Sequence, residues 1–517
     1  MDAPIDAGRM IGARAIMGWI GLRGLWTSYL ERSGPKTFSK NTLFPKGMAV
    51  IEKSREQVLL LIVIVFLTTM DGMDASIVNI ALPSIASSFL VDTSTASWVS
   101  LTYFMMMAGL LLVFGRLADR GIIKKVLMSG LALFTIFSLV CGLAITFEVL
   151  IIGRIFQGVG AAVMGACAPL LCVRFLPKSR LGLGMSTIAI GASIGYASGP
   201  TLGGIITQYL SWHWIFIINL PIGIAGILFM AKAIPKDEGN GRAYFDVPGS
   251  ALSVIAMIAG VFAIERSSHV GIEDFQIVAA IFIFIVSTIL FILWERRCAE
   301  PILNLSIFRS WEFNSVFSAY LLINLVGTGI WYLTPFYLSL AMGLDPATSG
   351  LFMLIPPVVT LMISVPIGKL SDRSGRRWFS VMSCMAMTTA SGILFLIDPV
   401  NGAAPLLIAL FFMGVLWGSC GPAASRIVEK IGTREKGTGS ALIAVAAYLG
   451  AAVGAAAYAA LFSTLSGAGN TPFADLDIHV FLEGYHGVML VGMAMAALGV
   501  VLSAAVKDEE RRPETTG

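Results

Sequence analysis

Charged side chains are scarce in this sequence of 517 residues, where Asp, Glu, Lys and Arg together make up 13%. A soluble protein usually carries about 25% charged residues. Hydrophobic residues make up 56% of the chain, and the mean hydropathy is +0.84. A soluble fold exposes a large share of its residues and cannot hide this much apolar surface. The composition therefore excludes a soluble enzyme, a nucleic-acid-binding protein and a disordered scaffold, and it predicts an integral membrane protein.

Patterns that bind metals or form disulfides are also lacking. The chain has six cysteines and four histidines. The cysteines lie mostly within apolar runs and form no Cys-x-x-Cys pair, so we interpret them as small buried hydrophobic residues. We expect no metal site and no cofactor. Because no nucleophile–base pair or phosphate-binding loop is found either, we do not expect an enzyme.

Fourteen apolar runs are long enough to cross a bilayer as helices, since a hydrocarbon core of about 30 Å needs roughly 20 residues. If the N-terminus is cytoplasmic, every Lys and Arg except Arg154 and Arg266 falls on the inside, as the positive-inside rule requires. We therefore predict fourteen spans with both termini in the cytoplasm. The alternative is twelve spans, with 247–294 as a peripheral hairpin. The runs are 58–84, 95–116, 126–146, 148–173, 182–208, 212–233, 247–264, 274–294, 313–338, 347–368, 378–397, 403–426, 437–464 and 484–506.

A motif of the form G-x-L-[AS]-D-R, followed by basic residues, occurs after the second run and again after the tenth. Both copies fall on the same side, which predicts two parallel six-helix halves. The Asp can accept charge-assisted hydrogen bonds and so hold one conformation as a latch, and the Gly allows close helix approach. The alternative is a loop whose basic residues only set the topology. The candidate gating residues are Gly115, Asp119, Arg120, Gly368, Asp372, Arg373, Gly375 and Arg376.

The repeat and the spans together define the expected domains. We predict an all-α fold of two six-helix bundles with two further helices between them. The tail 1–57 is interpreted either as an interfacial amphipathic helix or as a disordered or over-extended start ahead of Met48. The boundaries are 1–57 for the cytoplasmic N-terminal tail, 58–233 for the first bundle, 234–312 for the inserted helices and linkers, 313–506 for the second bundle and 507–517 for the cytoplasmic C-terminal tail.

Three charged residues lie well inside the expected spans, away from their ends, where charge is costly and usually functional. Asp71 and Asp74 share one face of the first span, and Arg154 lies in the fourth. A carboxylate withdrawn from water binds a proton more readily, and a nearby cation opposes this. Such a group can couple transport to a proton gradient. The alternatives are a solvated Asp71 at a cavity mouth and a purely structural pair of Asp74 with Arg154.

Small residues form a stripe along the fifth span. Gly195, Gly199 and Gly203 recur every fourth residue, so another helix can pack closely there. A proline in this span removes a backbone hydrogen bond and permits a bend. Ordinary small-residue packing is the alternative for one such spacing. The candidate residues of this helix are Gly195, Gly199, Pro200, Gly203 and Gly204.

Taken together, these segments resemble the major facilitator superfamily, and within it the fourteen-span drug:proton antiporters. The resemblance covers about residues 50–506. It rests on the first-span segment 74–83, the two loop motifs, the fourth-span segment Arg154-Ile-Phe-Gln157-Gly158-Val-Gly160, the fifth-span segment 195–204 and the sixth-span entry 212–223. In the first loop motif, Ile122 and Ile123 stand where the family has Gly-Arg, which predicts a weaker latch in the N-terminal half.

The resemblance implies an exporter that exchanges amphipathic, often cationic, drugs or toxins for protons. Asp74 and Arg154, with Asp71 as an extra acid, would couple the proton. Aromatic rings attract organic cations and methionine adapts to varied shapes, although interfacial anchoring is the alternative for each such residue. The candidate substrate pocket comprises Tyr103, Met106, Asn324, Trp331, Tyr332, Phe336 and Trp417.

The same resemblance implies a multi-pass protein of the cytoplasmic membrane that uses the proton gradient as its energy source. The expected partners are the substrate, protons and the lipid bilayer, with no nucleic acid. We expect a monomer and leave a periplasmic adaptor open. Two other functions are kept as alternatives: a proton-coupled symporter or facilitator of a nutrient or metabolite, and a non-transporting membrane receptor or scaffold.

Overall fold

The structure is a computed structural model that describes residues 54–118, 122–177, 180–235, 237, 246–267, 273–298, 305–431, 436–468 and 471–507. These residues form helices joined by short connections and contain no strand. The tails expected at 1–57 and 507–517 lie almost wholly outside the described residues.

The first half contains α3 (Ser54–Phe89), α4 (Thr93–Ala118), α5 (Ile123–Gly142), α6 (Phe147–Phe175), α7 (Leu181–Tyr209), α8 (Trp214–Ile217) and α9 (Asn219–Ala233). Between the halves lie α10 (Val247–Arg266) and α11 (Phe275–Glu295). The second half contains η2 (Leu305–Arg309), α12 (Trp311–Phe336), the π-helical turn η3 (Tyr337–Ala341), α13 (Pro346–Met353), α14 (Ile355–Ser374), α15 (Arg377–Phe395), η4 (Pro399–Asn401), α16 (Ala404–Gly418), α17 (Cys420–Ile431), α18 (Lys436–Ser466), η6 (Phe473–Asp475) and α19 (Ile478–Ala505).

Each expected span coincides with one helix or with two consecutive helices. Within the described ranges, twelve helical segments are long and apolar enough to cross a membrane, and α10 and α11 are among them. The other two expected spans coincide with α4 and α7, which are not among these twelve segments and are 26 and 29 residues long. The total of fourteen spans stays a prediction. The last helix begins at Ile478, six residues before the expected start, because Asp477 accepts a hydrogen bond from the backbone N–H of His479 and caps it.

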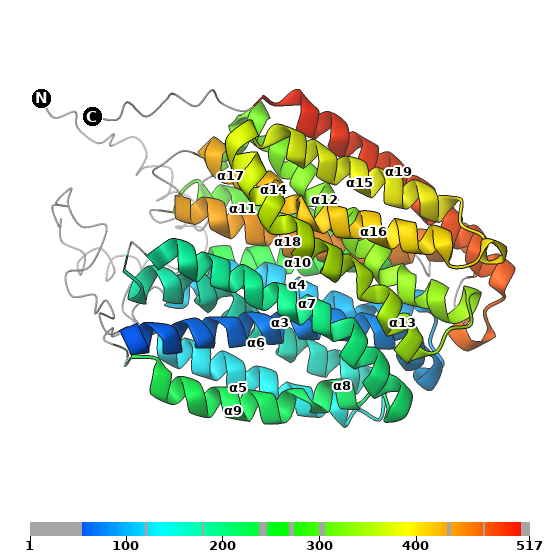
Figure 1. Cartoon of the computed structure of the whole chain (residues 1–517), viewed down its shortest axis with the longest axis horizontal. Helices are drawn as coiled ribbons and strands as arrows, with labels where there is room; N and C mark the ends of the chain where they lie inside the picture. Colours follow the sequence, from blue (N-terminus) through cyan, green and yellow to red (C-terminus); the bar gives the residue numbers. More distant parts are fainter. Residues whose placement is uncertain are drawn as a thin grey trace, which may run out of the picture. The chain divides into compact units, whose positions relative to one another are not determined.

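The packing within the first half is repeated in the second. Helix α3 packs along α7, and α12 packs along α18 in the same way. Helix α5 packs on α6, and α15 packs on α16. The halves meet mainly through α4 with α18 and α7 with α13, and also through α3 with α12. In Figure 1 the helices of the first half run from blue to green, and the last helix of the second half is red. The inserted α10 packs on both α4 and α18, so it covers the junction of the halves.

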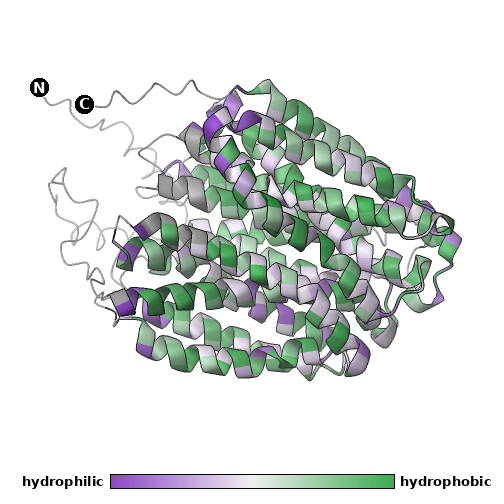
Figure 2. Ribbon diagram, viewed as in Figure 1, coloured by the Kyte–Doolittle hydropathy of each residue, from purple (hydrophilic) through white to green (hydrophobic). Residues whose placement is uncertain are grey.

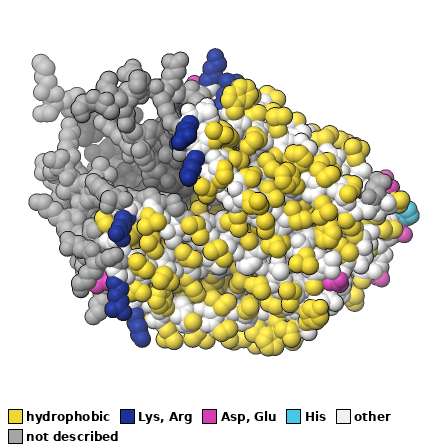
Figure 3. Space-filling view, viewed as in Figure 1, with side chains coloured by type: hydrophobic (Ala, Val, Ile, Leu, Met, Phe, Trp, Pro, Cys, Tyr) yellow, Lys and Arg dark blue, Asp and Glu magenta, His cyan; other side chains and the backbone are white. Residues whose placement is uncertain are grey.

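The surface has the polarity that a bilayer requires. Figure 2 shows hydrophobic residues along the middle of the helices and hydrophilic ones gathered at their ends. On the face drawn in Figure 3, hydrophobic side chains cover the middle, Lys and Arg gather at one end, and Asp, Glu and His at the other. A hydrophobic band between two polar ends matches lipid in the middle and water at both ends.

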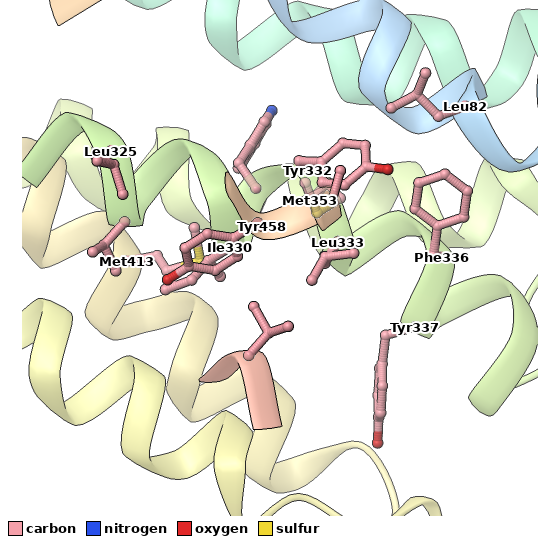
Figure 4. Close-up of a cluster of buried hydrophobic side chains, with 14 of the residues drawn as sticks. Leu82, Leu325, Ile330, Tyr332, Leu333, Phe336, Tyr337, Met353, Met413 and Tyr458 are labelled. Atoms are coloured by element: carbon pink, nitrogen blue, oxygen red, sulfur yellow. The ribbon is translucent and has the colours of Figure 1, made fainter. Parts of the chain in front are cut away.

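The two halves touch firmly at one end of the bundle, which we call the closed end. The backbone N–H of Phe473 donates to the carbonyl of Val91 at 3.1 Å, and the hydroxyl of Tyr332 donates to the carbonyl of Thr93. Figure 4 shows Tyr332 and Phe336 of α12 on the side toward Leu82 of α3, and all three are fully or almost fully buried. This apolar cluster joins the halves and excludes water between them.

The stripe of small residues on α7 holds α3, as the spacing predicts. A Cβ atom added to Gly195 would lie 2.4 Å from the carbonyl oxygen of Thr69 and 2.7 Å from the backbone nitrogen of Met73. The backbones of the two helices therefore meet at a distance that only glycine allows. Gly204, at the end of the stripe, faces the carbonyl of Pro346 on α13 instead. One face of α7 thus packs against α3 within the first half and against α13 of the second half at the closed end.

We expect Gly195→Ala to lower the melting temperature of the purified protein by several degrees. The new methyl group would meet backbone atoms that cannot rotate away, and such overpacking costs about 1–3 kcal/mol. Gly421→Ala is the matched control, because a Cβ there meets nothing within 4 Å. A thiol-reactive dye reports unfolding through the buried cysteines, which include Cys141 and Cys384. Equal melting temperatures for the two variants would contradict the close α3–α7 contact.

Candidate functional site

A buried ion pair lies inside the first half. The carboxylate of Asp74 on α3 accepts from Nη1 of Arg154 on α6 at 2.7 Å. Asp74 is 0% exposed and Arg154 is 1% exposed. The pairing that the two spans predict is therefore present. It lies within the packed bundle rather than across an open cavity, because neighbouring helices cover both side chains.

Polar groups from α4, α6 and α9 complete this site. The second oxygen of Asp74 accepts from Nε2 of Gln157 at 2.9 Å and from Nδ2 of Asn219 at 3.1 Å. Arg154 donates through Nε to the carbonyl of Val99 on α4 at 2.8 Å and through Nη1 to Gln157. Buried charges need such partners to offset their lost hydration. The pair therefore ties α3, α4, α6 and α9 together.

Tyr103 joins this pair to the second carboxylate of α3. The guanidinium of Arg154 lies over the ring of Tyr103, 4.4 Å from its centroid. The hydroxyl of Tyr103 donates to Oδ1 of Asp71 at 2.7 Å. The other oxygen of Asp71 accepts from the hydroxyl of Tyr448 on α18 at 3.1 Å. Asp71 is thus held by one tyrosine from each half of the protein.

A cavity of about 420 Å³ lies between the halves. Its wall carries few polar groups, and its aromatic rings come from both halves, namely Phe104 and Tyr196 from the first and Trp331, Trp417 and Tyr448 from the second. This is the concave, largely apolar surface that binds small amphipathic molecules. The remaining lining residues are Ala75, Asn79, Ala192, Ser193, Asn324, Thr328, Pro356, Pro357, Thr360, Ala444, Ala447 and Ala451.

Three of the seven predicted pocket residues line this cavity: Asn324, Trp331 and Trp417. The other four, Tyr103, Met106, Tyr332 and Phe336, do not line this cavity, and their part in binding substrate stays a prediction. Tyr103 is turned toward Arg154 and Asp71, and Met106 packs against Gly158 of α6. Tyr332 and Phe336 belong to the closed end. Each of the four packs against another helix, which the residue types alone do not reveal.

The two loop motifs do not show the close helix approach expected at their glycines. A Cβ at Gly115 or Gly368 meets no atom within 4 Å in the part of the chain that the structure describes. The backbone contacts that join the halves, such as Phe473 with Val91 and Gly204 with Pro346, lie at the closed end instead. Gly375 has a φ of +93°, a conformation that suits glycine, and it ends α14. Asp119 and Arg120 lie outside the described residues, as does the side chain of Asp372. The latch itself stays a prediction.

Basic residues of the second half cap α19. Arg426 is 1% exposed and donates to the carbonyls of Ser503 and Val506. Arg377, beside the second loop motif, donates to the carbonyl of Ala504. Cations at a helix C-terminus bind its free carbonyls and interact favourably with the negative end of the helix dipole. Part of the basic cluster therefore anchors the end of a helix. Arg373 is exposed, and Arg376 is partly buried.

Sequence reasoning missed several residues of the site. Gln157 and Asn219 lie in segments that it singled out, and Gln157 is one helical turn from Arg154, so their polarity was a usable signal. Tyr448 lies in an alanine-rich helix that carries no charged residue beyond its first position, so it gave no such signal. Within the described residues, no group of His, Cys, Asp and Glu could hold a metal ion.

Comparison with known proteins identifies the family. The model of the Major Facilitator Superfamily matches residues 64–455, and again 313–516. The chain belongs to the major facilitator superfamily. The two matches overlap over the second half, as expected for a family with a repeated bundle. Members of this family are transporters, so the chain is a membrane transporter and not an enzyme.

Two relatives illustrate the range of names among similar sequences. A putative multidrug resistance protein MdtD of Pectobacterium atrosepticum is 31% identical over 349 residues, which are 67% of this chain and 74% of that protein. The riboflavin transporter RibZ of Clostridioides difficile is 29% identical over 423 residues, or 80% of this chain and 89% of that one.

Solved structures agree on the fold. A bacterial homologue of the human lysosomal transporter Spinster, in an inward-facing and unoccupied conformation, aligns with a TM-score of 0.64 at 14% identity, covering 88% of this chain and 97% of that one. The xylose transporter XylE of E. coli, in a partially occluded inward-open conformation, aligns with a TM-score of 0.57 at 12% identity, covering 86% and 97%. At these identities the likeness shows the fold alone.

We expect Asp74→Asn and Arg154→Met each to destabilise the protein strongly, because removing one partner of a buried pair costs about 3–5 kcal/mol. The double variant should lose much less than the sum of the two, since neither charge is then left alone. Melting curves of all four proteins in detergent measure this coupling. Glu312→Gln is the control, because the Glu312–Lys430 pair is a surface contact with Glu312 58% exposed, and such pairs contribute little. Additive losses would show that the pair carries no coupling.

Proposed function

We propose that the protein is a proton-coupled antiporter of the cytoplasmic membrane that exports small amphipathic, often cationic, compounds by alternating access. The observation that carries this proposal is the cavity between the halves, whose walls hold aromatic rings from both. Aromatic faces attract organic cations and accept flat apolar molecules without demanding a fixed hydrogen-bond pattern. The multidrug names of several relatives support the same substrate class.

Proton coupling is assigned to Asp74, Asp71 and Arg154. Arg154 holds Asp74 of α3 while it also donates to Val99 of α4. Protonation of Asp74 would remove the charge that Arg154 pairs with and weaken the tie between these helices. Loss of the proton would restore it. A charge change at one buried residue can thereby bias the first half between two arrangements.

The closed end supplies one of the two states that alternating access requires. By the positive-inside rule, the end rich in Lys and Arg in Figure 3 faces the cytoplasm, so the closed end faces outward. The cavity then lies in a conformation sealed from the outside. The loop motifs, at the other end, would close when the halves rock. Both termini are cytoplasmic in this arrangement.

Transport of a metabolite, as a proton-coupled symporter or facilitator, is the second candidate, and the name of the riboflavin transporter RibZ favours a metabolite as substrate. The aromatic rings of the cavity could also stack against a flat neutral ring. The direction of flux under an imposed pH gradient separates the two candidates. An antiporter moves substrate against the flow of protons, whereas a symporter moves it with that flow.

Proteoliposomes loaded with tetraphenylphosphonium should release it faster when a pH gradient drives protons inward. The double variant Asp74→Asn with Arg154→Met should remain folded and lose this acceleration, because it keeps the packing and lacks the charge pair. Release that ignores the gradient in the wild-type protein would contradict proton coupling. Movement of the cation in the same direction as the protons would favour the symporter.

Trp331→Ala should weaken tetraphenylphosphonium binding by about ten-fold, which is within the range of a desolvated cation–π contact. Trp331 is 8% exposed and lines the cavity. Trp311→Ala is the matched control on the same helix, because Trp311 is 67% exposed at the start of α12 and does not line the cavity. Isothermal titration of both purified variants measures the effect. Equal binding by the two would place the cation elsewhere.

A further inference from the structure

The two carboxylates of α3 have different surroundings. Asp74 is fully buried and pairs with a guanidinium at 2.7 Å. Asp71 is partly exposed, and its hydrogen-bond partners in the described chain are the neutral hydroxyls of Tyr103 and Tyr448. No cationic side chain of the described residues contacts it. Asp71 is therefore the carboxylate whose charge the protein leaves without a counter-charge.

Asp71 lies next to the cavity wall, although it is not itself one of the lining residues. Ala75 and Asn79 line the cavity and follow Asp71 by one and two helical turns on α3, so the three share a face of the helix. Tyr448, which binds Asp71, is itself part of the cavity wall. A molecule in the cavity therefore meets Tyr448, one of the two groups that hold Asp71, whereas the side chains that hold Asp74, namely Arg154, Gln157 and Asn219, do not line the cavity.

Groups from α3, α4, α7 and α18 surround Asp71. Tyr103 faces it from α4 and Tyr448 from α18. Tyr196 of α7 packs against Gly72, the residue after Asp71. Asp74 lies one turn away on α3, and Arg154 is separated from Asp71 by the ring of Tyr103. The nearest charges are thus a second carboxylate, already paired, and a guanidinium turned toward that carboxylate.

A carboxyl group in such a place has two ways to avoid an unpaired buried charge: it can bind a proton and become neutral, or it can stay ionised and pair with a cation from the cavity. We propose that Asp71 is the site at which a cationic substrate and a proton exchange directly. As the cation enters the cavity, the proton leaves the carboxyl oxygen for water, and one positive charge replaces another. This inference rests on the proposed function, and it assigns recognition of the cationic substrate to Asp71 rather than to the Asp74–Arg154 pair.

The two tyrosines connect this exchange to the movement of the halves. Tyr103 belongs to the first half and Tyr448 to the second, and both donate to the same carboxylate. Rocking of α18 away from α3 removes one donor and so changes the environment in which the carboxylate holds its proton or cation. Asp71 therefore responds both to the substrate and to the conformation of the transporter.

Calorimetric titration of the purified wild-type protein with tetraphenylphosphonium, in two buffers of different ionisation enthalpy, counts the protons released on binding. We expect Asp71→Asn to release about one proton fewer per bound cation and to bind the cation at least about ten-fold more weakly. Asp71→Glu, which keeps the carboxylate, should retain the release. If Asp71→Asn releases as many protons as the wild type, the proposal is wrong.

A neutral lipophilic dye, N-phenyl-1-naphthylamine, tests whether Asp71 recognises charge. It should bind the wild type and Asp71→Asn equally. Equal losses for the dye and the cation would mean that Asp71 only shapes the cavity, which overturns the proposal. Tyr448→Phe should change the pH at which cation binding is half-maximal. Tyr458→Phe on the same helix should not, because Tyr458 packs against Gly329 and Gly492 instead. An unchanged pH profile for both variants also counts against the proposal.

These outcomes separate this proposal from the proposed function. If the wild-type protein neither binds nor transports lipophilic cations, the exporter function itself fails. If it transports them against protons while Asp71→Asn keeps normal proton release, the exporter function stands and Asp71 is not the exchange site. Loss of proton release in the double variant Asp74→Asn with Arg154→Met, but not in Asp71→Asn, would assign the exchange to the buried pair instead.

Discussion

The ion pair between Asp74 and Arg154 lies where neither charge could persist alone. Both side chains are buried among helices that face lipid on their outer sides, and the hydration that each charge has lost must be offset by partners inside the protein. Gln157, Asn219 and the carbonyl of Val99 provide them. Four helices of the first half are thereby held in one arrangement by one set of polar contacts, and any change in the charge of Asp74 acts on all four.

The two ends of the bundle have contrasting construction. The closed end uses backbone contacts and large apolar side chains, as at Gly204 against Pro346 and in the cluster around Phe336. Contacts of this kind are tight but carry little charge, so they can separate and re-form without exposing ions to lipid. The other end carries the Lys and Arg residues that stay in water. The central cavity, between these ends, has aromatic rings from both halves within reach of a carboxylate.

Glycine has two distinct uses in this fold. On α7 it lets two backbones meet, and the positions involved, such as Gly195, face backbone atoms of α3. At the end of α14, Gly375 has a positive φ and terminates the helix before the basic cluster. The glycines that open the loop motifs serve neither purpose in this conformation, because nothing described lies beside them.

The sequence by itself determined the membrane class, the position of each helix along the chain, the repeated halves, the close helix packing on α7 and the partner of Asp74. These follow from signals that are local or periodic: apolar runs of bilayer length, glycines every fourth residue, and a charge too costly to leave unpaired in lipid. Tertiary structure alone decided which aromatic residues face the cavity. Tyr332 and Trp331 are neighbours in sequence, yet one seals the closed end and the other lines the cavity. On a helix that is apolar on every side, the sequence does not show which side chains face the cavity, because this depends on the helices that surround it. Some of these helices belong to the other half, as α18 with Tyr448 does.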